Sequence, residues 1–478
     1  MASQERLLPR VQPDGMTPFR TWVFGLGHLL NDISGAIWFN YGMIFLAEVQ
    51  KVTPAAIGII FLIGQIADAA ATPLVGYLSD QFNSRIGKRT PWYIFGTILM
   101  PVSFFIFFLP CSVCELPEDE KTRTIVESAW FSFFSTFDNI GWAAIQIAHL
   151  ALIPALTPIK EKRDRIISIR NAFTFIANIV VLLVALLLFK LMSDAHQQFL
   201  YLAGLMLGGG VLVNVLFIVI IREKALVRIA ETSYRELGAL LLSPKVQIEL
   251  SPRTPTRPMR GRTVTWKDWM KKPQIYVIGL LYMLARLGNN FTTGMIPFYL
   301  IYVLGVRGNE GSASMPWELA VVSLVMYSAS VTASFVQERF RCFSRRLIFI
   351  IGCIALLTGG IPMTFIGPEV KYSLIGLVCC LGVGFSLCMN SSMGLITAFV
   401  GADANSGAFV WGIMGLLDKV SSGVAIFMVT NMGDLSESSY VRNFTCAVLL
   451  GCGVLGILAS LLVKHIPEIS EKQIAHDS

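Results

Sequence analysis

Seven polar or ionisable side chains interrupt stretches of the chain that are otherwise apolar: Asp32, Asp68, Gln146, His149, Arg170, Arg286 and Lys419. A charged group at bilayer depth costs at least about 2.5–3.5 kcal/mol on insertion scales, so it points to a function by default. A carboxylate can hold an ammonium group, a guanidinium or ammonium can hold a carboxylate, and histidine can carry a proton. We therefore expect these seven residues to bind a substrate.

A purely structural role is the alternative for the same residues. Buried ion pairs could hold two parts of the protein together, and Arg286 could pair with Asp32 or Asp68 without touching substrate. Arg170 could extend to the membrane surface, and His149 could bond a neighbouring helix.

Two further acids, Asp138 and Asp418, are not assigned to the site. Asp418 precedes Lys419 directly, so on a helix the two side chains point about 100° apart and are not expected to pair.

The elements that carry these residues are expected to be membrane-spanning helices. Of the 478 residues, 54% are hydrophobic and 14% charged, and the mean hydropathy is +0.64. This composition excludes a soluble enzyme, a disordered chain and a fibrous repeat. Twelve apolar blocks are long enough to cross a bilayer: 22–47, 54–77, 92–110, 127–156, 166–191, 198–221, 274–304, 317–336, 347–367, 372–400, 406–431 and 441–464. We expect an all-α membrane protein.

The distribution of Lys and Arg predicts the orientation of the helices. Of the 38 Lys and Arg residues, 28 lie in the termini and the even-numbered connections, which places that side in the cytoplasm. The same bias accounts for the net charge of +7 without a nucleic acid partner. We expect a cytoplasmic N-terminal tail (1–21), an N-terminal six-helix half (22–221), a cytoplasmic linker (222–272), a C-terminal six-helix half (273–464) and a cytoplasmic C-terminal tail (465–478).

A pattern of glycine, acidic and basic residues runs from the end of the second block into the loop after it. It resembles the G-x-x-x-D-x-x-x-x-R-x-G-K-R signature of the major facilitator superfamily, and two six-helix halves are typical of that fold. We expect its residues to control gating: Gly76, Asp80, Arg85, Gly87, Lys88 and Arg89.

The first two blocks also resemble the glycoside–pentoside–hexuronide:cation symporter branch of this superfamily. In that branch, two carboxylates of the second helix serve the coupling cation; Asp68 matches the first, and Thr72 stands in place of the second. Gln146 stands where a sugar-binding carboxylate is expected. Charged positions of the family's cavity are matched by Asp32, Arg170 and Lys419.

A closer resemblance covers nearly the whole chain and is to lysosomal and melanosomal cysteine transporters of the superfamily. It is carried by 27–32, 64–68, 72–77, 146–150, 152–154, 405–410, 417–420 and the pair Cys111 and Cys114. The resemblance implies an alternating-access carrier that brings cysteine into the organelle.

We expect cysteine to cross the membrane by facilitated diffusion, without coupling to an ion gradient. An acidic lumen would drive proton symport outward, and a lone Asp68 beside a cation such as Arg286 is poorly suited to sodium. The alternatives are a cation-coupled sugar symporter and a lipid transporter or non-transporting receptor. The sequence shows no pattern of a nucleophile and a base that would indicate an enzyme, and no cofactor is expected.

Two features lie outside the membrane blocks. Cys111 and Cys114 could form a disulfide if their compartment is oxidising; a zinc site is not expected, because no second ligand pair lies near. In the linker, Glu236, Leu240 and Leu241 form an acidic dileucine pattern, which predicts a sorting adaptor as a partner.

Overall fold

The computed structural model describes residues 15–157, 160–241, 266–308, 313–339, 343–370, 372–400 and 404–463. The N-terminal half is built from α1 (Pro18–Leu26), α2 (Leu29–Ile37), the π-helical segments η1 (Trp38–Gly42) and η2 (Phe45–Val49), α3 (Pro54–Gln81), α4 (Thr90–Phe107), the 3-10 turn η3 (Ser112–Glu115), α5 (Glu120–Leu156), α6 (Lys160–Leu191) and α7 (Ala195–Ile220).

The linker and the C-terminal half are also helical. They contain α8 (Glu223–Leu241), α10 (Trp266–Met270), α11 (Gln274–Phe298), the π-helical η4 (Tyr299–Val303), α12 (Glu318–Arg339), α13 (Arg345–Met363), the 3-10 turn η5 (Pro368–Val370), α14 (Ser373–Val400), α15 (Ala404–Asn431) and α16 (Ser438–Leu461).

Ten helices of the described chain are long and apolar enough to cross a membrane. The all-α membrane architecture is therefore confirmed. The first and seventh expected spans are not among the ten: the first is interrupted at Gly27, and α11 carries Arg286, Asn289 and Asn290. The count of twelve spans and the cytoplasmic termini stay predictions.

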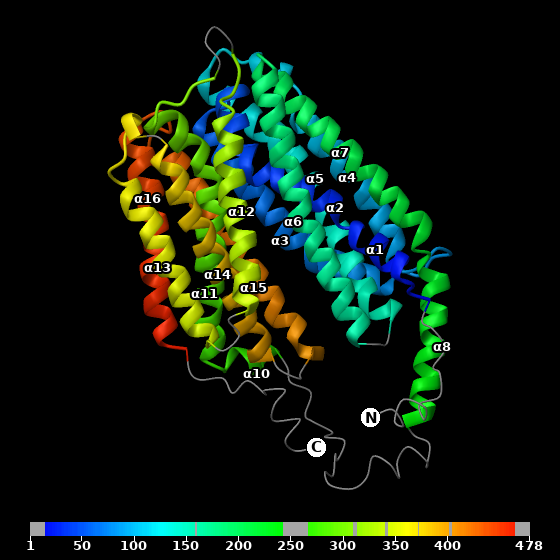
Figure 1. Ribbon diagram of the computed structural model, residues 1–478. Helices are drawn as coiled ribbons and strands as arrows, with labels where there is room; N and C mark the ends of the chain where they lie inside the picture. The colour runs from blue at the N-terminus through cyan, green and yellow to red at the C-terminus, as the bar shows by residue number, and fades with distance from the viewer. Residues whose placement is uncertain are drawn as a thin grey trace.

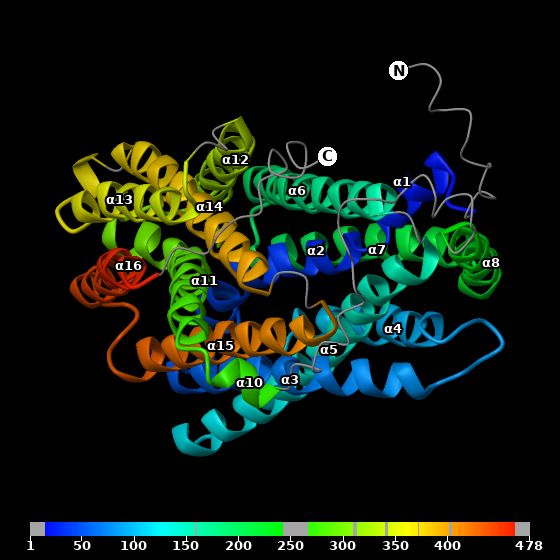
Figure 2. The same cartoon turned by 90° about the horizontal axis from the view of Figure 1, so that it is seen from below.

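The two halves lean together at one end and diverge at the other (Figure 1). Helices α8 and α10 lie at the diverging end. The halves contact each other through α3 with α15, α6 with α12 and η1 with α11. Figure 2 shows the first two of these pairs side by side. Within the halves, α5 packs on α3 and α4, and α14 packs in the same way on α12 and α13.

The first and seventh spans end in the same unusual way. The π-helical η2 and η4 are 254 residues apart, and the residues that follow them, Lys51 and Gly305, both have positive φ, 54° and 65°. Each end is closed by the same two backbone bonds: Gln50 N to Phe45 O and Val52 N to Leu46 O, and Leu304 N to Tyr299 O and Val306 N to Leu300 O. These matched ends are those of two structural repeats.

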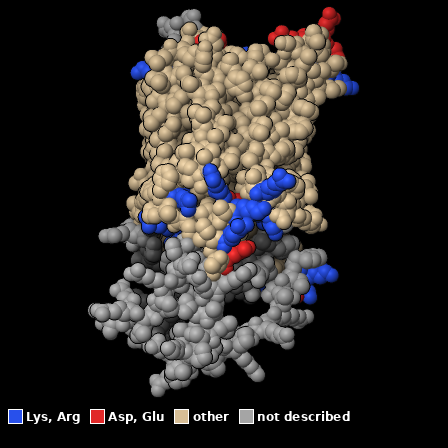
Figure 3. Space-filling view, turned by 90° about the vertical axis from the view of Figure 1, so that its right-hand side faces the viewer, with Lys and Arg blue, Asp and Glu red and all other residues tan. Residues whose placement is uncertain are grey.

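One face of the molecule shows the band that lipid would cover. In Figure 3 a broad zone carries no Lys, Arg, Asp or Glu, and blue basic side chains gather at its lower edge. This is the distribution that a bilayer imposes, because charged groups stay out of the hydrocarbon layer.

Candidate functional site

A cavity of about 1030 Å³ lies between the two halves. One wall comes from residues 168–175 in the first half of α6, and the other from the end of α12, the start of α13 and the end of α14. All these stretches lie toward the end where the halves diverge (Figure 1). The polar lining includes Arg170, Asn171, Thr174, Gln337 and Asn390.

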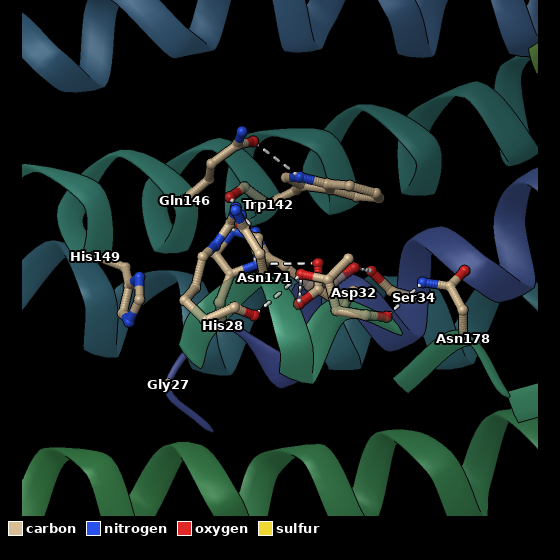
Figure 4. A network of polar contacts seen from close by, with 12 residues as sticks. Gly27, His28, Asp32, Ser34, Trp142, Gln146, His149, Asn171 and Asn178 are labelled. Carbon is tan, nitrogen blue, oxygen red and sulfur yellow. Dashed lines mark hydrogen bonds and ion pairs between the residues drawn. The ribbon is translucent and has the colours of Figure 1, made fainter. Parts of the chain in front are cut away.

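A network of polar contacts in the N-terminal half reaches this cavity through Arg170 and Thr174 (Figure 4). His28 Nδ1 lies 3.1 Å from Asp32, and the Arg170 guanidinium lies 3.0 Å from His28 Nε2. Thr174 donates to the second oxygen of Asp32 at 3.0 Å. The same Arg170 nitrogen lies 3.1 Å from His28 Nδ1. In the neutral tautomer that carries its proton on Nδ1, His28 donates to Asp32, because a carboxylate only accepts, and leaves Nε2 to accept from Arg170. Arg170 is turned inward and does not extend to the membrane surface.

A second pair connects the halves. Lys419 of α15 forms an ion pair with Asp68 of α3, and Thr72 donates to the other oxygen of Asp68 at 3.2 Å. The Lys419 ammonium also lies 5.8 Å from the Trp142 ring. Trp142 in turn donates to Gln146 at 3.0 Å, which brings Gln146 close to this pair.

A third pair lies within the C-terminal half and corrects one expectation. Arg286 bonds Asp418 at 2.7 Å, so the expected partners Asp32 and Asp68 are wrong. The reason is that α11 packs on α15 of its own half. Asn290 supports the pair by donating to Asp418 at 3.1 Å. Asp418, which was not assigned to the site, is the partner of Arg286.

Two residues of the expected site or its surroundings are buried away from the cavity lining. His149 is fully buried, and its Nε2 donates to the Phe24 carbonyl at 2.8 Å; Figure 4 shows it apart from the contacts around Asp32. Asp138 is 2% exposed, and its Oδ1 has no hydrogen-bond partner.

The comparison with known proteins supplies the family. The profile of the family described as MFS/sugar transport protein matches residues 23–440. The chain belongs to this family. Major facilitator superfamily domain-containing protein 12 of Mus musculus is 30% identical over 472 residues, covering 93% of both chains. The Homo sapiens protein of that name is 28% identical over 464 residues, covering 92% of this chain and 91% of its own.

Solved structures of the major facilitator superfamily have the same fold. The inward open xylose transporter XylE from E. coli superimposes with a TM-score of 0.64 at 15% identity, over 95% of this chain and 97% of its own. The protein is therefore a membrane transporter of the major facilitator fold and not an enzyme.

The signature loop of this family folds around a residue that the sequence did not single out. Glu223, the first residue of α8, accepts the backbone N–H groups of Lys88, Arg89 and Thr90 at 2.8, 3.0 and 2.7 Å. These are amides at the N-terminus of α4, which has no other cap. Gly87 has a φ of 135° and touches the same carboxylate, so no side chain fits there.

The other loop residues are placed differently. Arg89 also donates to Ser79, and Arg85 is exposed. A Cβ on Gly76 would meet only Ile147, at 3.8 Å, so no close helix approach requires a glycine at this position. Asp80 lies in the last turn of α3, and its side chain is outside the described part.

The cysteine pair and the dileucine pattern lie outside the membrane region. Cys111 and Cys114 form a disulfide. Glu236, Leu240 and Leu241 belong to α8, and their side chains lie outside the described residues.

The sequence contained a signal for two of the missed residues. His28 precedes Asp32 by four positions, the spacing that places two side chains on one helix face. Thr174 has the same relation to Arg170. Glu223 carried no such signal, because its contacts are more than 130 residues away.

Proposed function

We propose that this membrane transporter carries a small zwitterionic amino acid, cysteine, by alternating access into a lysosome-like or melanosome-like organelle. The observation that carries the proposal is the contact series Arg170, His28 and Asp32, which places opposite charges next to each other at the cavity. The sequence resemblance to lysosomal cysteine transporters supports both the substrate and the location.

The network suggests how a zwitterion would bind. Its carboxylate would bond the guanidinium of Arg170, whose Nε has no hydrogen-bond partner. Its ammonium group would bond Asp32, replacing His28 as donor. Each bond to a charged group contributes about 1.5–3 kcal/mol. The substrate thus replaces contacts that the protein otherwise makes internally.

Facilitated diffusion is part of the proposal. A proton moving down a gradient of one pH unit supplies about 1.4 kcal/mol, and out of an acidic lumen it would drive symport outward. The Lys419 ammonium already occupies the Asp68 carboxylate, where a sodium ion would otherwise bind. The cation that pairs with Asp68 is Lys419. Arg286, which was first expected beside Asp68, pairs with Asp418 instead.

Cation-coupled sugar transport is the second candidate. It is favoured by the buried Asp138, a carboxylate whose Oδ1 has no hydrogen-bond partner and which could take up a proton or a metal cation. The family description, MFS/sugar transport protein, fits this candidate as well.

Uptake into proteoliposomes separates the candidates. Labelled cysteine, a labelled sugar and a labelled lysolipid are offered in parallel, with imposed proton or sodium gradients and a reductant. We expect saturable cysteine uptake that stops at equal concentrations. Uphill accumulation driven by either ion would overturn uniport, and uptake of sugar or lysolipid alone would overturn the substrate.

A matched pair of variants tests the site. Arg170→Gln removes the carboxylate partner and should raise the KM for cysteine roughly 10- to 100-fold. Lys190→Gln removes an exposed cation from the far end of the same helix and should leave KM unchanged. Equal effects of the two changes would contradict a direct role for Arg170.

We also propose that the loop from Gly76 to Arg89 controls the opening of the transporter at the end where the two halves diverge.

A further inference from the structure

The first membrane span is broken next to the Arg170 network. Helix α1 ends at Leu26 and α2 begins at Leu29, so the regular helix is interrupted at Gly27 and His28. A break in an apolar layer leaves backbone carbonyls without partners, and each must be satisfied by another group. Here the last turn of α1 closes with Gly27 N bonding Phe24 O at 3.0 Å.

Side chains of two other helices satisfy the broken backbone. Tyr93 of α4 donates its hydroxyl to the Gly27 carbonyl at 2.5 Å. His149 of α5 donates from Nε2 to the Phe24 carbonyl at 2.8 Å, and its ring lies 4.3 Å from the Phe24 ring. Both side chains are fully buried. They are therefore part of the wall behind the break and do not reach the cavity.

Neighbouring helices pack closely against the break. A Cβ on Gly27 would collide with the Phe217 ring, and one on Gly25 would lie 3.3 Å from the backbone nitrogen of Arg170. The break is thus contacted by four helices, α4, α5, α6 and α7. The next residue after Gly27 is His28, whose ring connects Asp32 with Arg170.

We propose that Tyr93 and His149 are positioning residues of the transport site: they hold the break in the first span so that His28 keeps Asp32 and Arg170 in register. The inference rests on the proposed function for its transport readout. It moves His149 from substrate contact to support of the backbone.

The experiment compares three changes and one control. Tyr93→Phe and His149→Leu each remove one donor to the broken backbone, and His149→Gln restores an N–H at a similar reach. Tyr41→Phe is the control, because Tyr41 is a fully buried tyrosine of the same span whose hydroxyl has no hydrogen-bond partner. Hydrogen–deuterium exchange of the peptide covering 24–32 is measured without substrate, and KM and maximal rate for cysteine are measured in proteoliposomes.

We expect faster exchange in 24–32 for Tyr93→Phe and His149→Leu, with KM raised about fivefold to tenfold and the maximal rate nearly unchanged. His149→Gln and Tyr41→Phe should behave as the unchanged protein. Unchanged exchange in 24–32, exchange rising equally over the whole N-terminal half, or a fall in maximal rate at constant KM would each overturn the proposal. If the unchanged protein does not transport cysteine, the proposed function fails, and the exchange data alone decide the positioning role.

Discussion

The contact between Tyr302 and Glu48 predicts how the closed end of the transporter opens. Tyr302 donates its hydroxyl to the Glu48 carboxylate, and the two residues are 254 positions apart, the offset that relates η2 to η4. Residues that occupy the same place in two parallel repeats can meet only at the axis between the repeats. This hydrogen bond therefore lies at the centre of the closed end, opposite the cavity mouth.

Tyr302→Phe removes this bond and keeps the ring. A hydrogen bond to a charged acceptor contributes about 1.5–3 kcal/mol. We take the lower part of that range, because the Glu48 side chain is 19% exposed and also pairs with Lys51 at 3.2 Å. A loss of about 1.5–2 kcal/mol should shift the equilibrium roughly 10- to 30-fold toward the state open at this end.

The distance between the two halves at this end measures the shift. Spin labels on Leu116 and Met432, both exposed, report it by double electron–electron resonance. Tyr299→Phe is the matched control: Tyr299 belongs to the same π-helical segment, but its hydroxyl bonds the Met363 carbonyl within the C-terminal half. An unchanged distance distribution for Tyr302→Phe, or an equal change for Tyr299→Phe, would refute the reasoning.

Three other contacts give measurable expectations. Neutralising Asp68 or Lys419 alone should lower cysteine uptake at least tenfold more than neutralising both, because a single unpaired buried charge costs about 3–5 kcal/mol; equal loss in all three variants would contradict this. Glu223→Ala should speed amide exchange at 88–90 roughly tenfold or more, and unchanged protection would contradict the cap. Replacing Leu240 and Leu241 by Ala should move the protein from lysosomes to the cell surface in fluorescence images; retention would place the sorting signal elsewhere.

The fold class could be predicted because hydropathy is a property of single stretches. Apolar blocks of about 20 residues predict spanning helices wherever they occur. The interruption at Gly27 escaped this reasoning, because the apolar block 22–47 extends on both sides of it. The break depends on donors supplied by Tyr93 and His149, which lie more than 60 residues away in sequence.

The charged residues of the membrane helices could be identified from the sequence, but their pairing could not. Helical spacing correctly predicted that Asp418 and Lys419 point in different directions. The same geometry lets Lys419 reach Asp68 in one half while Asp418 bonds Arg286 in the other. Pairing between helices depends on their packing and register, which residue spacing along one helix does not contain. For this reason Arg286 was given the wrong partners.

The balance of buried charge decides what cargo the described site favours, and Asp138 tests it. Three acids face three cations in the membrane region: Asp32 with Arg170 through His28, Asp68 with Lys419, and Asp418 with Arg286. A cargo without net charge leaves this balance intact, whereas a charged cargo leaves one buried group unpaired at a cost of several kcal/mol. Asp138 stands outside the three pairs, and its buried Oδ1 has no hydrogen-bond partner; a proton or a bound cation would stabilise such an oxygen. In a uniporter of zwitterions, Asp138→Asn should therefore leave the rate of cysteine uptake within about twofold of the original, since Asn keeps the shape of the protonated acid. In a symporter, the same change should abolish accumulation driven by an imposed proton or sodium gradient. Uptake by Asp138→Asn with and without each gradient distinguishes the two, and loss of ion-driven accumulation would replace uniport by coupled transport through Asp138.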